Sequence, residues 1–171
     1  MKKLSKITES IWSDMQDRSA GDAIREEDKI TTNEELQNRI YKLYKEQGEG
    51  ETLDVSSLTK LIKCDDFSNI FKGYVILKHI IGLENWDVSN VKNMNCMFLG
   101  CKNFNADLSK WDVSSVGDME CMFYDCRTFN SDLSKWDVSG VKKIGGVKKM
   151  GSMFYKCQSL KQIPSWYYTH S

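Results

Sequence analysis

The stretch LSKWDVSSVGDMECMFYDCRTFNSD, residues 108–132, is decisive for the fold because close copies of it lie on both sides. The 25 residues before it, 83–107, read LENWDVSNVKNMNCMFLGCKNFNAD, and a further copy begins with LSKWDVSGVKK at residue 133. Every copy carries a tryptophan in the same place, namely Trp86, Trp111 and Trp136. A fixed period of this kind is the signature of a repeat protein.

The apolar positions of one copy predict a short strand followed by a helical turn. Trp111 and Val113 alternate with polar residues, which is a strand pattern. From Val116 onward the apolar residues return at steps of three and four, which predicts a helix or a 3₁₀ turn on the opposite wall. One copy cannot bury this face alone, whereas stacked copies can. The sequence therefore predicts an α/β repeat solenoid, a leucine-rich-repeat-like right-handed coil of short parallel strands and helical turns.

Two further copies are imperfect. LDVSSLTKL, from Leu53, aligns with WDVSSVGDM and indicates an earlier, degenerate copy. In the last copy GVKKIG is followed at once by GVKKMG, so we expect Met150 in the core and one hexad looped out, because lengthening a loop costs little free energy. We expect residues 51–171 to form a solenoid of about four coils, closed by SLKQIPSWYY as a C-terminal cap.

Residues 1–50 are predicted to form a separate helical segment. The apolar stripe of its first helix consists of Leu4, Ile7, Ile11, Trp12 and Met15. Thr32 and Glu35 form a capping box at the start of a second helix, and Gly48 can end it. Two interpretations remain open. The segment is either a cap over the first coil or an anchor in a larger assembly, with Ile11, Trp12 and Met15 as its contact residues.

Composition and the N-terminus limit the location and the partners. Lys and Arg total 24 and so do Asp and Glu, so the net charge gives no reason to expect nucleic acid or membrane as a partner. The N-terminal lysines are not followed by the uninterrupted apolar core of a signal peptide or of a membrane helix. We therefore expect a cytoplasmic or virion protein rather than one exported by a visible signal, without membrane insertion.

Polar residues between the apolar slots are expected on the surface. They recur every 25 residues and would form columns along one face of the solenoid. Repeat proteins typically bind their partners on an extended face of this kind. The predicted interaction surface consists of Asp87, Lys110, Asp112, Ser114, Lys135, Asp137 and Ser139. Stacked aspartates repel each other, so the column needs compensation. The aspartates and serines either cap the backbone of a turn or bind a ligand.

The tryptophans and cysteines are expected in the core. Tryptophan occupies a leucine slot, which favours burial over an exposed ladder for sugars or proteins. The six cysteines are Cys64, Cys96, Cys101, Cys121, Cys126 and Cys157. The sequence contains no close CxxC pair, which is the spacing that would favour a zinc site. Without a signal peptide, reduced and buried thiols are expected rather than disulfides.

Sequence motifs give no support to an enzyme. The chain has two histidines and lacks a nucleophile elbow, a P-loop, a dinucleotide fingerprint and an HExxH motif. We expect no catalytic residues, no metal and no cofactor. The expected role is a non-catalytic protein-interaction or adhesion module with a protein partner.

The motifs DLSKWDVS, Met-x-x-Met-Phe and YDCRTFNSD resemble a known family. They are similar to the BspA-like leucine-rich repeats of bacterial surface proteins, in particular the 25-residue form common in mycoplasmas. The resemblance implies adhesion and surface binding and brings no catalytic residues. The stretch IWSDMQDRSAGDAIREED, residues 11–28, resembles N-terminal segments of Bacteroides and phage proteins. It supports the alternative of a structural component of a phage virion or other large assembly, anchored through residues 1–50.

Overall fold

The computed structural model describes residues 28–141, 143–144 and 147–168. Its α-helices are α2, Asn33–Glu46, and α3, Ser165–Tyr168. Its strands form two pairs, which are β1, Thr52–Asp54, with β2, His79–Ile81, and β3, Lys143–Ile144, with β4, Val147–Lys148. The first pair is parallel and the second is antiparallel. Short 3₁₀ turns span Ser56–Leu58 and Leu83–Asn85.

The predicted α/β solenoid of leucine-rich-repeat type is wrong. In the described residues the parallel sheet has only two strands, β1 and β2, and it is not closed. Residues 86–141, which contain most of the sequence repeat, have neither a helix nor a named strand. The predicted right-handed coil of strands and helical turns is therefore absent, and the chain has a small mixed fold built mainly from turns.

Local side-chain chemistry explains why the strand and the helical turn do not form. The Asp112 carboxylate accepts a hydrogen bond from the backbone N–H of Ser114 at 3.1 Å, and this local bond closes a turn where the alternating pattern predicted a strand. In the predicted helical turn, Cys121 and Asp125 have φ angles of 55° and 57°. Such left-handed residues interrupt a right-handed helix.

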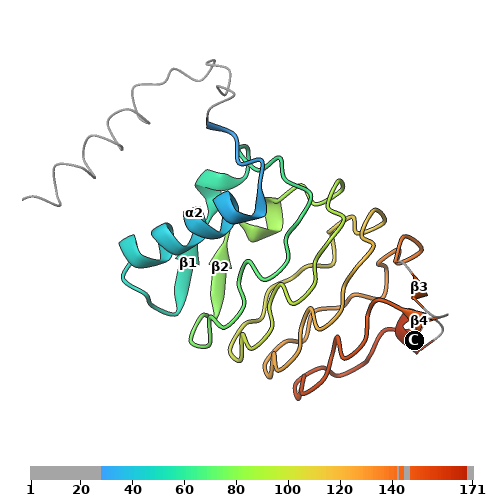
Figure 1. Cartoon of the computed structure of the whole chain (residues 1–171). Coiled ribbons are helices and arrows are strands. Elements are labelled where there is room, and N and C mark those ends of the chain that lie inside the picture. Colours follow the sequence, from blue (N-terminus) through green and yellow to red (C-terminus); the bar gives the residue numbers. More distant parts are fainter. Residues whose placement is uncertain (1–27, 142, 145–146, 169–171) are drawn as a thin grey trace, which may run out of the picture.

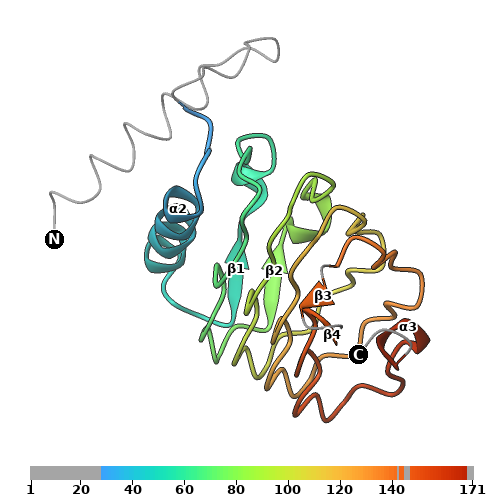
Figure 2. The ribbon, with the colours of Figure 1, turned by 45° about the vertical axis from the view of Figure 1, so that its right-hand side comes forward.

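Direct backbone hydrogen bonds join equivalent turns of neighbouring copies. The N–H of Cys96 donates to the carbonyl of Glu120 at 2.9 Å, and the N–H of Cys121 donates to the carbonyl of Gly151 at 3.0 Å. Figures 1 and 2 show these turns side by side in the order of the sequence, with α2 next to β1 at one end and α3 at the other. The 25-residue period thus fixes which backbone groups meet, although it does not produce strands.

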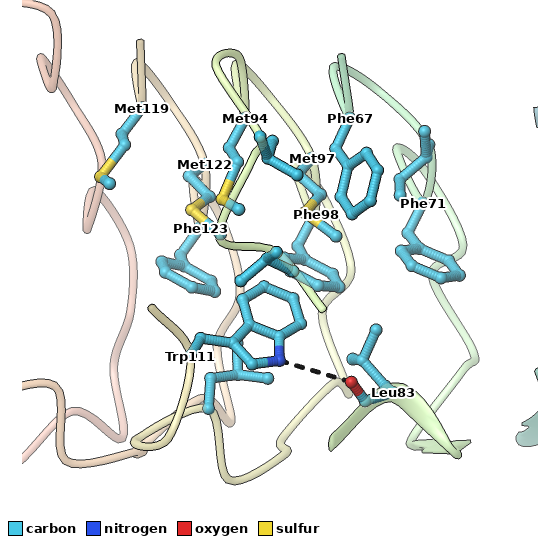
Figure 3. Close-up of a cluster of buried hydrophobic side chains, with 14 of the residues drawn as sticks. Phe67, Phe71, Leu83, Met94, Met97, Phe98, Trp111, Met119, Met122 and Phe123 are labelled. Carbon is cyan, nitrogen blue, oxygen red and sulfur yellow. Dashed lines mark hydrogen bonds between the residues drawn. The ribbon is translucent and has the colours of Figure 1, made fainter. Parts of the chain in front are cut away.

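Stacked aromatic rings form the centre of the core. The ring of Phe98 lies 5.4 Å from that of Phe71 and 5.6 Å from that of Phe123, nearly parallel to both. Figure 3 shows these rings in one row, with the methionines above them and Trp111 below. The prediction that the repeated tryptophans are core residues is confirmed, because Trp86, Trp111 and Trp136 are only 4–5% exposed.

At the N-terminal end α2 covers the first turns. Its capping box is confirmed, since the Thr32 side chain accepts from the N–H of Glu35 and the Glu35 side chain accepts from the N–H of Thr32. The helix buries Leu36 and Ile40 completely. The predicted first helix and the predicted anchor, Ile11, Trp12 and Met15, lie outside the described residues.

The two imperfect copies give one confirmation and one correction. Met150 is fully buried, as expected for the core slot, and the short antiparallel pair of β3 and β4 precedes it. The alignment of Leu53 with Trp86 is wrong in register, because Leu53 pairs with Ile80 in the parallel sheet. The buried indole N–H of Trp86 has no hydrogen-bond partner among the described residues.

Candidate functional site

The candidate site begins with a polar hollow of about 600 Å³ between two neighbouring copies. Its lining residues are Asn105, Ala106, Asp107, Ser109, Lys110, Asn130, Ser131, Asp132 and Lys135. A second hollow of about 320 Å³ shares the segment 130–132 with it and continues to Lys161 and Ser165. Together they form what we call the polar groove, which crosses three successive turns of the chain.

An asparagine ladder forms the floor of the polar groove. The side-chain oxygen of Asn105 accepts from the N–H of Asn130 at 3.0 Å, and the side-chain oxygen of Asn130 accepts from the N–H of Lys161 at 3.0 Å. The ladder therefore holds three turns in register through their side chains. Because an amide has two donors besides its oxygen, each asparagine also brings donor groups to the groove.

Two aspartates give the groove fixed negative charges. The Asp107 carboxylate accepts from the backbone N–H of Ser109 at 2.9 Å, and the Asp132 carboxylate accepts from that of Ser134 at 2.9 Å. Hydrogen bonds from these serines lower the pKa of both carboxyl groups, and the neighbouring lysines lower it further. Both side chains are therefore ionised near neutral pH and act as acceptors rather than as proton donors.

The polar groove brings together two residues of the predicted interaction surface, Lys110 and Lys135. Both lysines are exposed. Each lies near the aspartate three residues before it, Asp107 or Asp132, without coming within ion-pair distance of a described carboxylate. Their ammonium groups can therefore contact a partner without first breaking an ion pair within the described chain.

The other predicted surface residues lie outside the groove and shape the turns. Asp87, Asp112 and Asp137 accept from the backbone N–H groups of Ser89, Ser114 and Ser139 at 2.9–3.1 Å. Hydrogen bonds from Ser114 lower the pKa of Asp112, while the neighbouring aspartates of the column oppose this effect. Of the two roles considered for this column, the geometry is that of turn capping.

Sequence reasoning missed the residues that line most of the polar groove. They are Asn105, Asp107, Ser109, Asn130 and Asp132. The signal was available in FNADLSK and FNSDLSK, which repeat Asn, Asp, Ser and Lys at the same spacing just before each tryptophan. Repeated asparagines and aspartates of this kind indicate turns with side-chain hydrogen bonds to the backbone.

The described residues contain neither a metal-binding group of side chains nor a membrane-spanning helix. The described residues contain no group of three or more His, Cys, Asp or Glu side chains arranged to hold a metal ion. Among the same residues, no helix has the length and apolar character needed to cross a membrane. All six cysteines are free thiols, with Cys64, Cys101 and Cys126 buried and the others partly exposed.

No curated protein and no solved structure matches the chain. Residues 65–170 match a family described as "Mycoplasma protein of unknown function, DUF285". This match confirms the mycoplasma-type resemblance at the level of the family, without a leucine-rich-repeat assignment. Because the match covers more than half of the sequence, the chain belongs to the DUF285 family.

Proposed function

We propose that this protein is a non-catalytic interaction or adhesion module that holds an extended segment of a protein partner in the polar groove. The observation that carries the proposal is the repetition of the groove residues. Asn, Asp, Ser and Lys recur in neighbouring turns and face a shared hollow. An extended chain, which presents its own polar groups at regular intervals, matches such a site better than a compact ligand does.

The charges of the groove favour a partner segment with acidic side chains. Lys110, Lys135 and Lys161 line the two hollows, against the carboxylates of Asp107 and Asp132. The two carboxylates already accept backbone hydrogen bonds, whereas the lysines extend into solvent. Lysine can make charge-assisted hydrogen bonds to carboxylates. The aspartates and asparagines then complement the backbone N–H and carbonyl groups of the partner.

The ionisable groups of the groove support binding rather than catalysis. General acid catalysis needs a carboxyl group whose pKa is raised toward neutrality. The pKa shifts of Asp107 and Asp132 have the opposite direction because serine hydrogen bonds stabilise the charged form. The groove lining contains neither cysteine nor histidine.

Charge reversal in the groove tests the proposal. A K110E/K135E variant should lose the partner, and K60E/K92E is the matched control because these lysines are exposed and lie outside both hollows. A partner would be captured from the native source, purified, and titrated against all three proteins at two salt concentrations. We expect the groove variant to bind about tenfold or more weakly, since each exposed charge contact contributes up to about 1 kcal/mol and reversal adds repulsion. Equal affinities of the two variants would refute this use of the groove.

A substrate panel addresses the absence of catalysis separately. The full chain would be assayed against ester, peptide, phosphate and glycoside substrates. Turnover that is lost on D107N or D132N substitution would overturn the non-catalytic assignment while leaving the location of the site intact.

A further inference from the structure

Two of the six thiols differ from the others in their surroundings. Cys101, Cys126 and Cys157 each donate a hydrogen bond to a phenylalanine carbonyl of the preceding copy, at 2.8–3.0 Å. The side chains of Cys96 and Cys121 instead lie close to each other and are partly exposed. These two thiols are thus adjacent to one another and within reach of a small reagent from solvent.

The backbone places Cys96 directly beside Cys121. The N–H of Cys96 donates to the carbonyl of Glu120, and the N–H of Phe98 donates to the carbonyl of Met122, both at 2.9 Å. Cys121 lies between these two carbonyls on the neighbouring turn. Backbones joined side by side by such hydrogen bonds lie about 4.8 Å apart, which is the spacing known from neighbouring strands. This spacing falls in the range of about 4.4–6.8 Å between the Cα atoms of a disulfide.

The left-handed backbone conformation of these cysteines recurs at the same position of the other turns. Both have a φ of 55°, in the left-handed region that favours Gly, Asn and Asp. Asn69 occupies the equivalent position of the preceding turn with a φ of 61°, and Ser152 occupies that of the last copy with a φ of 55°. The position therefore forms without a thiol. The left-handed conformation thus belongs to the fold, whereas the thiol at this position is not needed to form the turn.

We propose that Cys96 and Cys121 form a dithiol modification site that reduces a low-molecular-weight disulfide and closes into a disulfide between two copies. The thiolate of one cysteine attacks the reagent, whose S–S bond breaks, so that a mixed disulfide forms and one reagent thiol leaves. The second cysteine loses its proton and attacks the protein sulfur of the mixed disulfide, which releases the second reagent thiol. Two electrons pass from the cysteines to the reagent, and two protons end on the released thiols.

Burial restricts the reaction to this pair. It raises the pKa of Cys64 to about 11 and the pKa values of Cys101 and Cys157 to about 12, and it also raises the pKa of Cys126, so the reactive thiolates of these four residues are scarce near neutral pH. Burial also raises the pKa values of Cys96 and Cys121, but at Cys96 the ammonium group of Lys72 opposes this effect. Cys96 is therefore the first nucleophile, and Cys121 resolves the mixed disulfide.

Oxidation of the full chain with oxidised glutathione tests this site. After native oxidation and alkylation of the remaining thiols, intact mass and disulfide mapping should show a loss of about 2 Da and one bridge, Cys96–Cys121. The C121S variant should retain glutathione on Cys96. It should fold because Ser152 already occupies the same position of another copy, and a thermal melt would verify this. A urea-unfolded sample, in which all six thiols react, shows that the reagent is active. Native protein that stays reduced, keeps a mixed disulfide or forms a different bridge would overturn the proposal.

Discussion

Two buried tryptophans provide a sharp test of how this fold is stabilised. Trp86 and Trp136 are both 4% exposed and occupy equivalent positions of the repeat. The indole N–H of Trp136 donates to the carbonyl of Leu108 at 3.0 Å. The indole nitrogen of Trp86 is buried without a hydrogen-bond partner in the described part of the chain. We predict that Trp136→Phe destabilises the protein more than Trp86→Phe does.

The difference between the two substitutions can be estimated from the structure. Each replaces an indole by a smaller ring, so the loss of buried volume largely cancels in the comparison. Trp136→Phe also loses a hydrogen bond worth about 1 kcal/mol. The carbonyl of Leu108 keeps a bond from the N–H of Trp111, so no acceptor is left unpaired. Trp86→Phe removes an unpaired buried donor, which otherwise costs about 1–3 kcal/mol. We therefore expect Trp136→Phe to cost about 2–4 kcal/mol more.

Urea unfolding followed by far-UV circular dichroism measures this difference, provided that both variants keep the wild-type m-value. Trp111→Phe should give an intermediate loss, because its bond to the carbonyl of Leu83 is longer, at 3.4 Å. If Trp86→Phe proved as costly as Trp136→Phe, the indole hydrogen bonds would not contribute as argued here.

Three further predictions concern turns, close backbone contacts and the insertion. Turn hydrogen bonds or an arginine partner lower the folded-state pKa of Asp87, Asp107, Asp112, Asp125 and Asp132. Stability from these groups is present above the unfolded aspartate pKa of about 3.9 and is lost as the pH falls through the lower folded values. The urea concentration at the unfolding midpoint should therefore decrease when the pH is lowered below about 4. A midpoint that does not change with pH would contradict this. Gly140→Ala should lower the free energy of unfolding by about 1–3 kcal/mol, because a Cβ would collide with the carbonyl of Ser114. Gly50→Ala places its Cβ in open space and should be nearly neutral in the same unfolding experiments. Deletion of the hexad 140–145 should leave the melting temperature within a few degrees of that of the wild type. GVKKMG can take the place of the deleted residues, and the length of a loop contributes little to the free energy of folding. If this variant were unfolded, the first hexad would be a structural part of the fold.

The sequence was informative wherever a residue type has one dominant local preference. The Thr32–Glu35 capping box predicted the start of α2, and the Met-x-x-Met-Phe spacing placed Met150 in the core. The alternating pattern at Trp111 and Val113 misled, because alternation shows only which residues are buried. The Asp112–Ser114 hydrogen bond forms a turn with the same burial pattern. Side-chain hydrogen bonds of this kind also explain why the polar groove was missed, since Asn105 and Asn130 act across copies rather than within one.

Donor groups in the core distinguish this fold from the predicted one. Leucine carries no polar atom, whereas a buried indole N–H requires an acceptor. The indole of Trp136 donates to the carbonyl of Leu108, and the thiol of Cys126 donates to that of Phe98, each 28 residues earlier. These two bonds together fix one register. A slip by a single residue would leave both donors unpaired, at a cost of about 1–3 kcal/mol for the indole alone. In this way turns can be aligned accurately without a continuous sheet. The same alignment brings Lys110 and Lys135 to one groove and Cys96 beside Cys121, so both proposed sites depend on the tryptophans and buried cysteines that set the register.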